Sequence, residues 1–148
     1  MTRAMILFIA IGFLTASADS NADADKKDLE LMQGDWAVVE YVTDGVKAED
    51  DNAQALFRTV KGNQYTVFLY DKPLASGTIK LDPSQKPKHI DSTPEKMPGK
   101  PLLGIYEIEG NRIKVCNAGP GKDRPTEFES KEGSEHRLVI LKRAAQKK

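Results

Sequence analysis

The chain of 148 residues carries 22 Lys and Arg against 22 Asp and Glu. This length suffices for one domain with a single modest core but not for two. The balanced charge argues against a nucleic-acid partner, because proteins that bind polyanions concentrate basic residues on one face. Cys116 is the only cysteine, which excludes an internal disulfide.

The N-terminus has the pattern of a signal peptide. Arg3 precedes an unbroken apolar run over residues 4–14, and small residues follow the run. These small residues place the signal peptide at residues 1–18, with cleavage as late as residue 24 as the alternative. The apolar run is shorter than the ~20 residues that a membrane-spanning helix needs. We therefore expect an exported protein, periplasmic or extracellular, without a membrane span.

The rest of the chain alternates apolar and polar residues with a period of two, which predicts a β domain over residues 28–143 and a basic tail over 144–148. A short helical turn over 28–33 opens the domain. Segment 47–56 is expected to be a loop or one helical turn at one end, and 124–128 to be extended because Pro125 restrains its neighbour. About eight strands are predicted, at residues 34–42, 57–61, 64–70, 74–81, 88–93, 102–109, 113–116 and 137–143.

Most of these strands are joined by short turns such as Gly62-Asn63, which favours an antiparallel meander. Closing the meander into a barrel removes the exposed sheet edges. A sandwich of two sheets is the alternative, but it needs longer crossings that only segments 82–87 and 94–101 could supply. The expected fold is therefore an all-β barrel.

An ordered set of motifs along nearly the whole mature chain resembles an uncharacterised lipocalin-like domain family that is abundant in planctomycete bacteria. The resemblance implies an antiparallel, up-and-down, lipocalin-like (calycin-type) barrel and secretion; it assigns no activity. The motifs that carry it lie at residues 31–36, 81–83, 86–91, 104–107, 120–128 and 141–143.

The same resemblance implies a structural base for the barrel. Lipocalin-type barrels carry a Gly-x-Trp at the start of the first strand, here Gly34 and Trp36, and return a cationic side chain to the tryptophan from the last strand. That cation is Lys142 or Arg143. A cation over an indole face is favourable, and its aliphatic stem covers the barrel floor.

Three polar side chains, Glu40, Tyr65 and Tyr106, share the inward parity of their strands with apolar neighbours. This composition is typical of a cavity with a few polar contacts for a ligand. It is also explained by a filled core whose polar tips lie at the barrel mouth. A cavity predicts binding of a small, partly apolar or amphipathic ligand. A filled core predicts an extracellular or cell-envelope module for protein interaction or structure.

Arg124 follows a Pro-Gly-Lys-Asp loop and could bind a carboxylate. We expect an internal ion pair, with Asp91 or Glu107 as the partner, ahead of an anionic ligand. The sequence makes no prediction of the oligomeric state.

Catalytic and metal sites find little support. Cys116 with His89 and His136 could be imagined as a thiol or hydrolytic centre, but none of the three lies in a recognisable nucleophile motif. A His89-x-Asp91 metal site lacks an obvious third ligand. We therefore expect neither an enzyme nor a metal or other cofactor, and we expect Cys116 to be at least partly sheltered.

Overall fold

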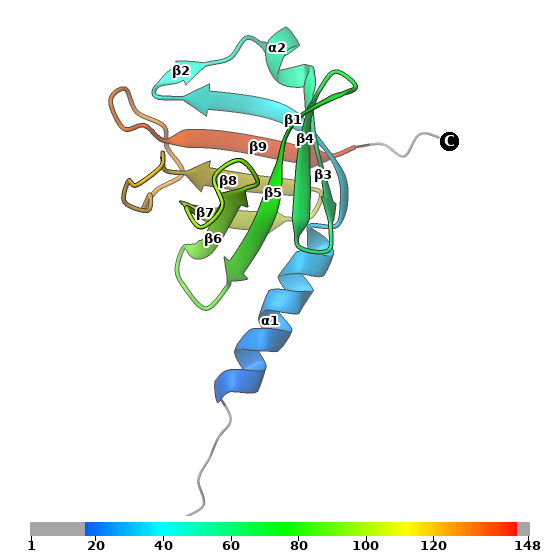
Figure 1. Cartoon of the computed structure of the whole chain (residues 1–148), viewed down its shortest axis with the longest axis vertical. Helices are drawn as coiled ribbons and strands as arrows, with labels where there is room; N and C mark the ends of the chain where they lie inside the picture. Colours follow the sequence, from blue (N-terminus) through cyan, green and yellow to red (C-terminus); the bar gives the residue numbers. More distant parts are fainter. Residues whose placement is uncertain (1–16, 145–148) are drawn as a thin grey trace, which may run out of the picture.

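The structure, a computed structural model, describes residues 17–144 and consists of a closed antiparallel barrel with a helix at one end (Figure 1). The predicted signal peptide lies outside the described residues, apart from residues 17 and 18. The predicted basic tail also lies outside them, apart from Ala144. The elements are α1 (Ser17–Leu31), β1 (Gly34–Thr43), β2 (Val46–Lys47), α2 (Asp50–Gln54), β3 (Leu56–Lys61), β4 (Gln64–Leu69), β5 (Lys72–Asp82), β6 (Lys88–Pro94), β7 (Leu102–Glu109), β8 (Arg112–Asn117) and β9 (Arg137–Arg143).

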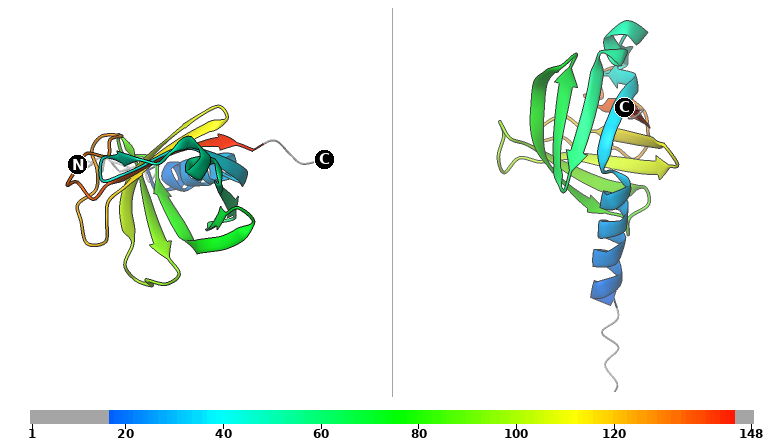
Figure 2. Two further views of the ribbon diagram at one scale, coloured as in Figure 1. Left: turned by 90° about the horizontal axis from the view of Figure 1, so that it is seen from above. Right: turned by 90° about the vertical axis from the view of Figure 1, so that its right-hand side faces the viewer.

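The strands follow one another around the barrel in chain order, apart from the two-residue β2, which pairs with the end of β1. β1 and β9 then pair, with Trp36 opposite Arg143 and Thr43 opposite Arg137, and this pairing closes the sheet (Figure 2). The closure leaves eight strands around the interior and confirms the predicted barrel over the sandwich.

The segments outside the strands match the sequence-based predictions only in part. The helical turn expected at one end of the barrel is α2. The helical lead-in is longer than the predicted turn, because α1 begins at Ser17 and points away from the barrel (Figure 1). Segment 124–128 lies in the long β8–β9 loop and forms no strand. No helix in residues 17–144 is long and apolar enough to span a membrane.

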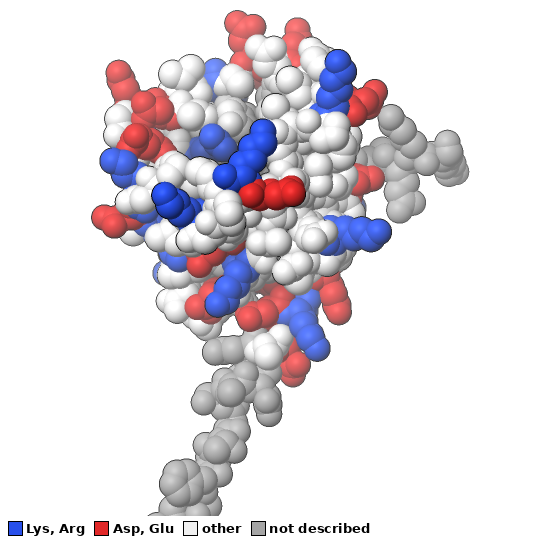
Figure 3. All heavy atoms as spheres, viewed as in Figure 1, with Lys and Arg blue, Asp and Glu red and all other residues white. Residues whose placement is uncertain are grey.

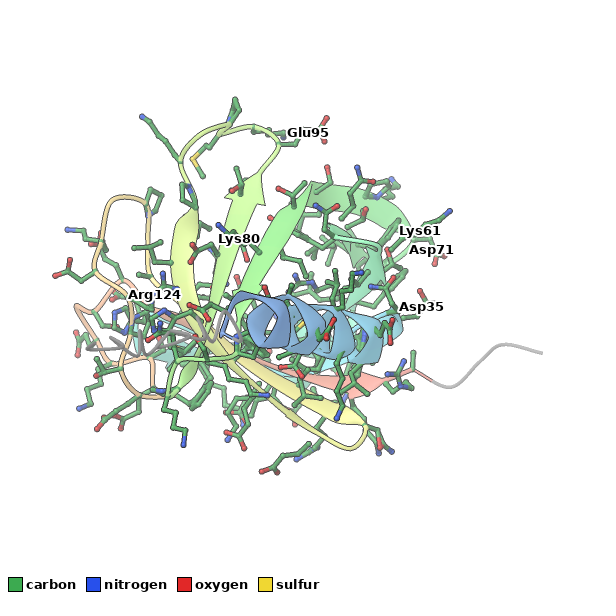
Figure 4. All side chains as sticks on the ribbon, turned by 90° about the horizontal axis from the view of Figure 1, so that it is seen from below. Asp35, Lys61, Asp71, Lys80, Glu95 and Arg124 are labelled. Atoms are coloured by element: carbon green, nitrogen blue, oxygen red, sulfur yellow. The ribbon has the colours of Figure 1, made fainter. Side chains whose placement is uncertain are left out.

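Figure 4 views the barrel from the end that α1 covers, and the core is packed at this end. Trp36 and Ile90 are fully buried there, and Tyr106 and Leu141 are almost fully buried. The Trp36 Nε1 donates a 2.8 Å hydrogen bond to the carbonyl of Met32, which links the first strand to the end of α1. Space for a ligand is therefore found in the other half of the barrel, towards the loops.

Candidate functional site: the barrel cavity

The loop-side half of the barrel encloses a cavity of about 320 Å³. Its wall is mostly apolar and is supplied by every large strand of the barrel, so the cavity is the barrel interior rather than a surface groove. The lining residues are Val38, Tyr41, Leu56, Arg58, Tyr65, Val67, Leu74, Ala75, Ser92, Pro94, Met97, Leu102, Asn117, Pro120, Arg137, Val139 and Leu141.

Glu40 does not line this cavity, and the prediction that it points inwards is wrong. A β-bulge in β1 shifts the register with β9 between Val38 and Glu40, so the side chains beyond the bulge exchange faces. Tyr41 takes the inward position and lines the cavity. Glu40 is half-exposed instead, and its Oε2 lies 3.8 Å from Lys47 Nζ in β2.

Tyr65 does line the cavity, as the alternation in β4 predicted. It is 8% exposed, and burial raises the pKa of its phenol. Its strand partner is Gly77, where a Cβ atom would lie 2.8 Å from the Tyr65 hydroxyl. The missing side chain at Gly77 therefore provides the space that the Tyr65 ring occupies.

Tyr106 points inwards but belongs to the closed end, so its expected place in the cavity is wrong. The Tyr106 hydroxyl donates a 2.7 Å hydrogen bond to Asp28 Oδ2 of α1, and Lys88 Nζ lies 2.8 Å from the same oxygen. Burial raises the Tyr106 pKa far above its usual range, and the hydrogen bond to Asp28 adds to the shift. This cluster attaches α1 to the barrel.

The cavity contains a guanidinium group that the sequence reasoning missed. Arg58 in β3 lies opposite Trp36 on one side and Val67 on the other, both of which point inwards, so its side chain enters the interior. The guanidinium lies over the Tyr65 ring, 4.6 Å from the ring centroid. Burial lowers the Arg58 pKa to about 10, which leaves the group charged at neutral pH.

Three further polar residues of the lining were also missed. Ser92 is 4% exposed, and its hydroxyl has no hydrogen-bond partner among the described residues. The same holds for Asn117 Oδ1. Arg137 is exposed, and its guanidinium lies 5.7 Å from the Tyr41 ring centroid. The cavity thus carries two guanidinium groups and no Asp or Glu.

The base of the barrel is built as expected, and the cation is Arg143 rather than Lys142. The Arg143 guanidinium lies 4.2 Å from the centroid of the Trp36 ring. It also donates 2.9 Å hydrogen bonds to the carbonyls of Gln33 and Leu31. Gly34 has a φ of +105°, and a Cβ atom there would lie 3.2 Å from the guanidinium, so glycine suits both the backbone and the packing.

Arg124 forms the internal ion pair that was expected, and its partner is Asp91 at 2.8 Å. It also donates a 2.7 Å hydrogen bond to the carbonyl of Gly104. In Figure 4 it lies beside the barrel wall, on the side of the β8–β9 loop. Its guanidinium is therefore engaged in holding that loop to β6 and β7 and is not part of the cavity.

The β8–β9 loop accounts for the burial of Cys116. The residue alternates with the inward-facing Val115, yet it is fully buried, and its thiol donates to the carbonyl of Glu129 in the loop at 3.4 Å. Burial raises the pKa of the Cys116 thiol, which makes it a poorer nucleophile. Within residues 17–144, no group of His, Cys, Asp and Glu side chains has the arrangement of a metal site.

The chain matches no family model, no curated protein and no solved structure. The features of the molecule that bear on function are therefore the cavity and the polar side chains within it.

Proposed function

We propose that the chain is a secreted, lipocalin-like barrel domain of the family it resembles, and that its interior binds one small, largely apolar ligand. The observation that carries the proposal is the cavity of about 320 Å³ in the loop-side half of the barrel. Ligand sites in proteins have volumes of roughly 300–1,000 Å³ and are mostly apolar, with a few polar groups that orient the ligand. The cavity lies at the small end of this range.

The distribution of the core supports this function over a barrel that is filled throughout. The closed end is packed around Trp36 and Tyr106, so the fold already has a core that stabilises it. The loop-side half adds apolar wall around empty space, and unfilled apolar space reduces stability because the wall loses contacts. A ligand that occupied the space would restore them.

The test is a fluorescence titration with a neutral naphthylamine dye. Trp36 is the only tryptophan and lies in the barrel floor, so energy transfer from it to the dye reports binding inside the barrel. We expect micromolar affinity, equivalent to about −8 kcal/mol. Val67→Phe fills part of the cavity and should weaken binding at least ten-fold, while Thr66→Val, on the opposite face of β4, should leave it unchanged.

Two results would count against the proposal. One is a folded protein that does not bind the dye at all, and the other is equal affinity in the wild type and in Val67→Phe, with the variant still folded by its melting temperature. Either would favour an interaction or structural module whose function lies on the outer surface.

A further inference from the structure

Arg58 is a partly buried cation in the cavity wall, and the described residues supply no anion for it. Within residues 17–144 no Asp or Glu forms an ion pair with it, and its Nε has no hydrogen-bond partner. The Tyr65 ring, at 4.6 Å, is the favourable contact it makes. Withdrawing a charge from water even in part without a partner is costly, and charged side chains inside proteins are usually paired. The cost calls for an explanation.

The position of Arg58 indicates what could supply the missing charge. Its neighbours Trp36 and Val67 place it towards the floor of the cavity. Arg137 lies at the other end, where its strand partners Thr43 and Asn117 lie beside the loops. The wall between the two consists mainly of apolar side chains such as Tyr41, which is the arrangement that a molecule with an anionic head and an apolar body would fill.

The positive charge is a property of the interior and not of the surface around it. On the face shown in Figure 3, acidic and basic side chains are interspersed, and the whole chain has equal numbers of each. A general affinity for anions would need a basic surface patch. Selectivity for an anion is thus expected inside the barrel.

On the basis of the proposed function, we infer that the ligand is an amphipathic monocarboxylic acid whose carboxylate binds Arg58 near the cavity floor. The planar guanidinium matches a carboxylate in a two-point contact, and the low-polarity surroundings strengthen the pair. The cavity has the volume of about ten water molecules at ~30 Å³ each. A medium-chain or aromatic acid fits this space, and a longer chain would extend through the mouth.

The experiment compares octanoic acid with 1-octanol, which differs from it in the head group, as competitors of the neutral dye at pH 7. We expect the wild type to bind the acid at least ten-fold more tightly than the alcohol. Arg58→Met should lose this preference and keep its affinity for the alcohol. Arg137→Met tests whether the guanidinium at the mouth holds the anion instead. Arg112→Met removes an exposed guanidinium outside the cavity and serves as the matched control, which should keep the preference.

A second readout separates a ligand-binding role for Arg58 from a structural one. Because methionine removes an unpaired, partly buried charge and retains much of the volume, the melting temperature of ligand-free Arg58→Met should equal or exceed that of the wild type. In wild type, saturating octanoic acid should raise the melting temperature, since a ligand that binds the folded state stabilises it. Arg58→Met should show little of this increase.

Equal binding of acid and alcohol by the wild type would overturn the inference, and this result needs no variant. Retention of the acid preference in Arg58→Met, with its loss in Arg137→Met, would also overturn it by assigning the anion to the mouth. If the alcohol and the dye bind and only the acid preference is missing, the proposed function stands and the ligand class is wrong. If none of the three binds, both fail.

Discussion

The Tyr106 hydroxyl and the Asp28 carboxylate form a 2.7 Å hydrogen bond at the closed end of the barrel, between β7 and α1. Asp28 is 7% exposed and also pairs with Lys88, so one carboxylate connects the helix to two adjacent strands. Because Asp28 and Tyr106 are buried, loss of the hydrogen bond between them is not made up by contact with solvent.

Tyr106→Phe should therefore destabilise the protein. The change removes one hydrogen bond to a charged group and little volume, so we expect a loss of about 1.5–3 kcal/mol in the free energy of unfolding. Tyr70→Phe is the control, because Tyr70 is 70% exposed and its change should cost less than about 0.5 kcal/mol. Urea denaturation followed by Trp36 fluorescence measures both. Equal stabilities of the two variants would show that the contact contributes nothing.

The raised pKa of Tyr106 predicts a loss of stability in alkaline solution. Above about pH 10 the phenol ionises in the unfolded chain while the folded state retains its proton, so the unfolded state binds fewer protons and stability falls as pH rises. Arg58, with its lowered pKa, acts in the opposite direction. The measurement is therefore the difference between wild type and Tyr106→Phe, both of which contain Arg58. The wild type should lose more stability between pH 9 and 11, and parallel curves would contradict this.

Arg143 and Lys142 are adjacent in β9, and we expect them to contribute very differently to the stability of the fold. Arg143→Met removes the contact with Trp36 and two hydrogen bonds to carbonyls, and should cost about 2 kcal/mol. Lys142→Met changes an exposed side chain and should cost less than about 0.5 kcal/mol. Chemical denaturation of both variants measures the two losses of stability. A larger loss for Lys142→Met would show that Arg143 is not the cation that stabilises the base of the barrel.

The signal peptide leads to a prediction about the mature protein. N-terminal sequencing of material from the native host should begin at Asp19 or Asp25. Replacing Ile9 by lysine interrupts the apolar run and should block export, leaving the leader attached. Cytosolic wild-type protein that retains Met1 would contradict the prediction.

Strand alternation predicted which residues face inwards but not how deep they lie. Tyr106 points inwards as expected, yet it lies at the closed end, because alternation distinguishes two faces of a sheet and contains no information about position along the barrel axis. The prediction for Glu40 is wrong for another reason. The bulge beside it exchanges the two faces, and nothing in the local alternation of β1 indicates where the extra residue is.

The polar groups of the cavity could have been found from the sequence. Arg58 shares the face of its strand with Leu56 and Val60, and Arg137 shares a face with Val139 and Leu141, so both lie on the apolar parity of their strands. The absence of an anionic partner for Arg58, by contrast, depends on contacts between strands that are far apart in the sequence, and only the folded barrel reveals it.

The contact between Arg124 and Asp91 should control access to Cys116. The β8–β9 loop covers the thiol, and Arg124 holds this loop to the barrel wall through Asp91 and the Gly104 carbonyl. In the wild type, a thiol reagent should react slowly with the folded protein and rapidly with the protein in urea. Arg124→Met should release the loop and accelerate labelling of the folded protein at least several-fold, because local opening exposes the thiol.

The control for this prediction lies in the same loop. Lys122 forms an ion pair with Glu135 at 2.9 Å in which both side chains are more than half exposed, and such pairs contribute little. Lys122→Met should therefore leave the labelling rate unchanged. The rates should be compared under conditions where both variants are fully folded, so that global unfolding does not account for the difference. Immediate, stoichiometric labelling of the folded wild type would show instead that the thiol is accessible, and the reactive-cysteine hypothesis would regain support.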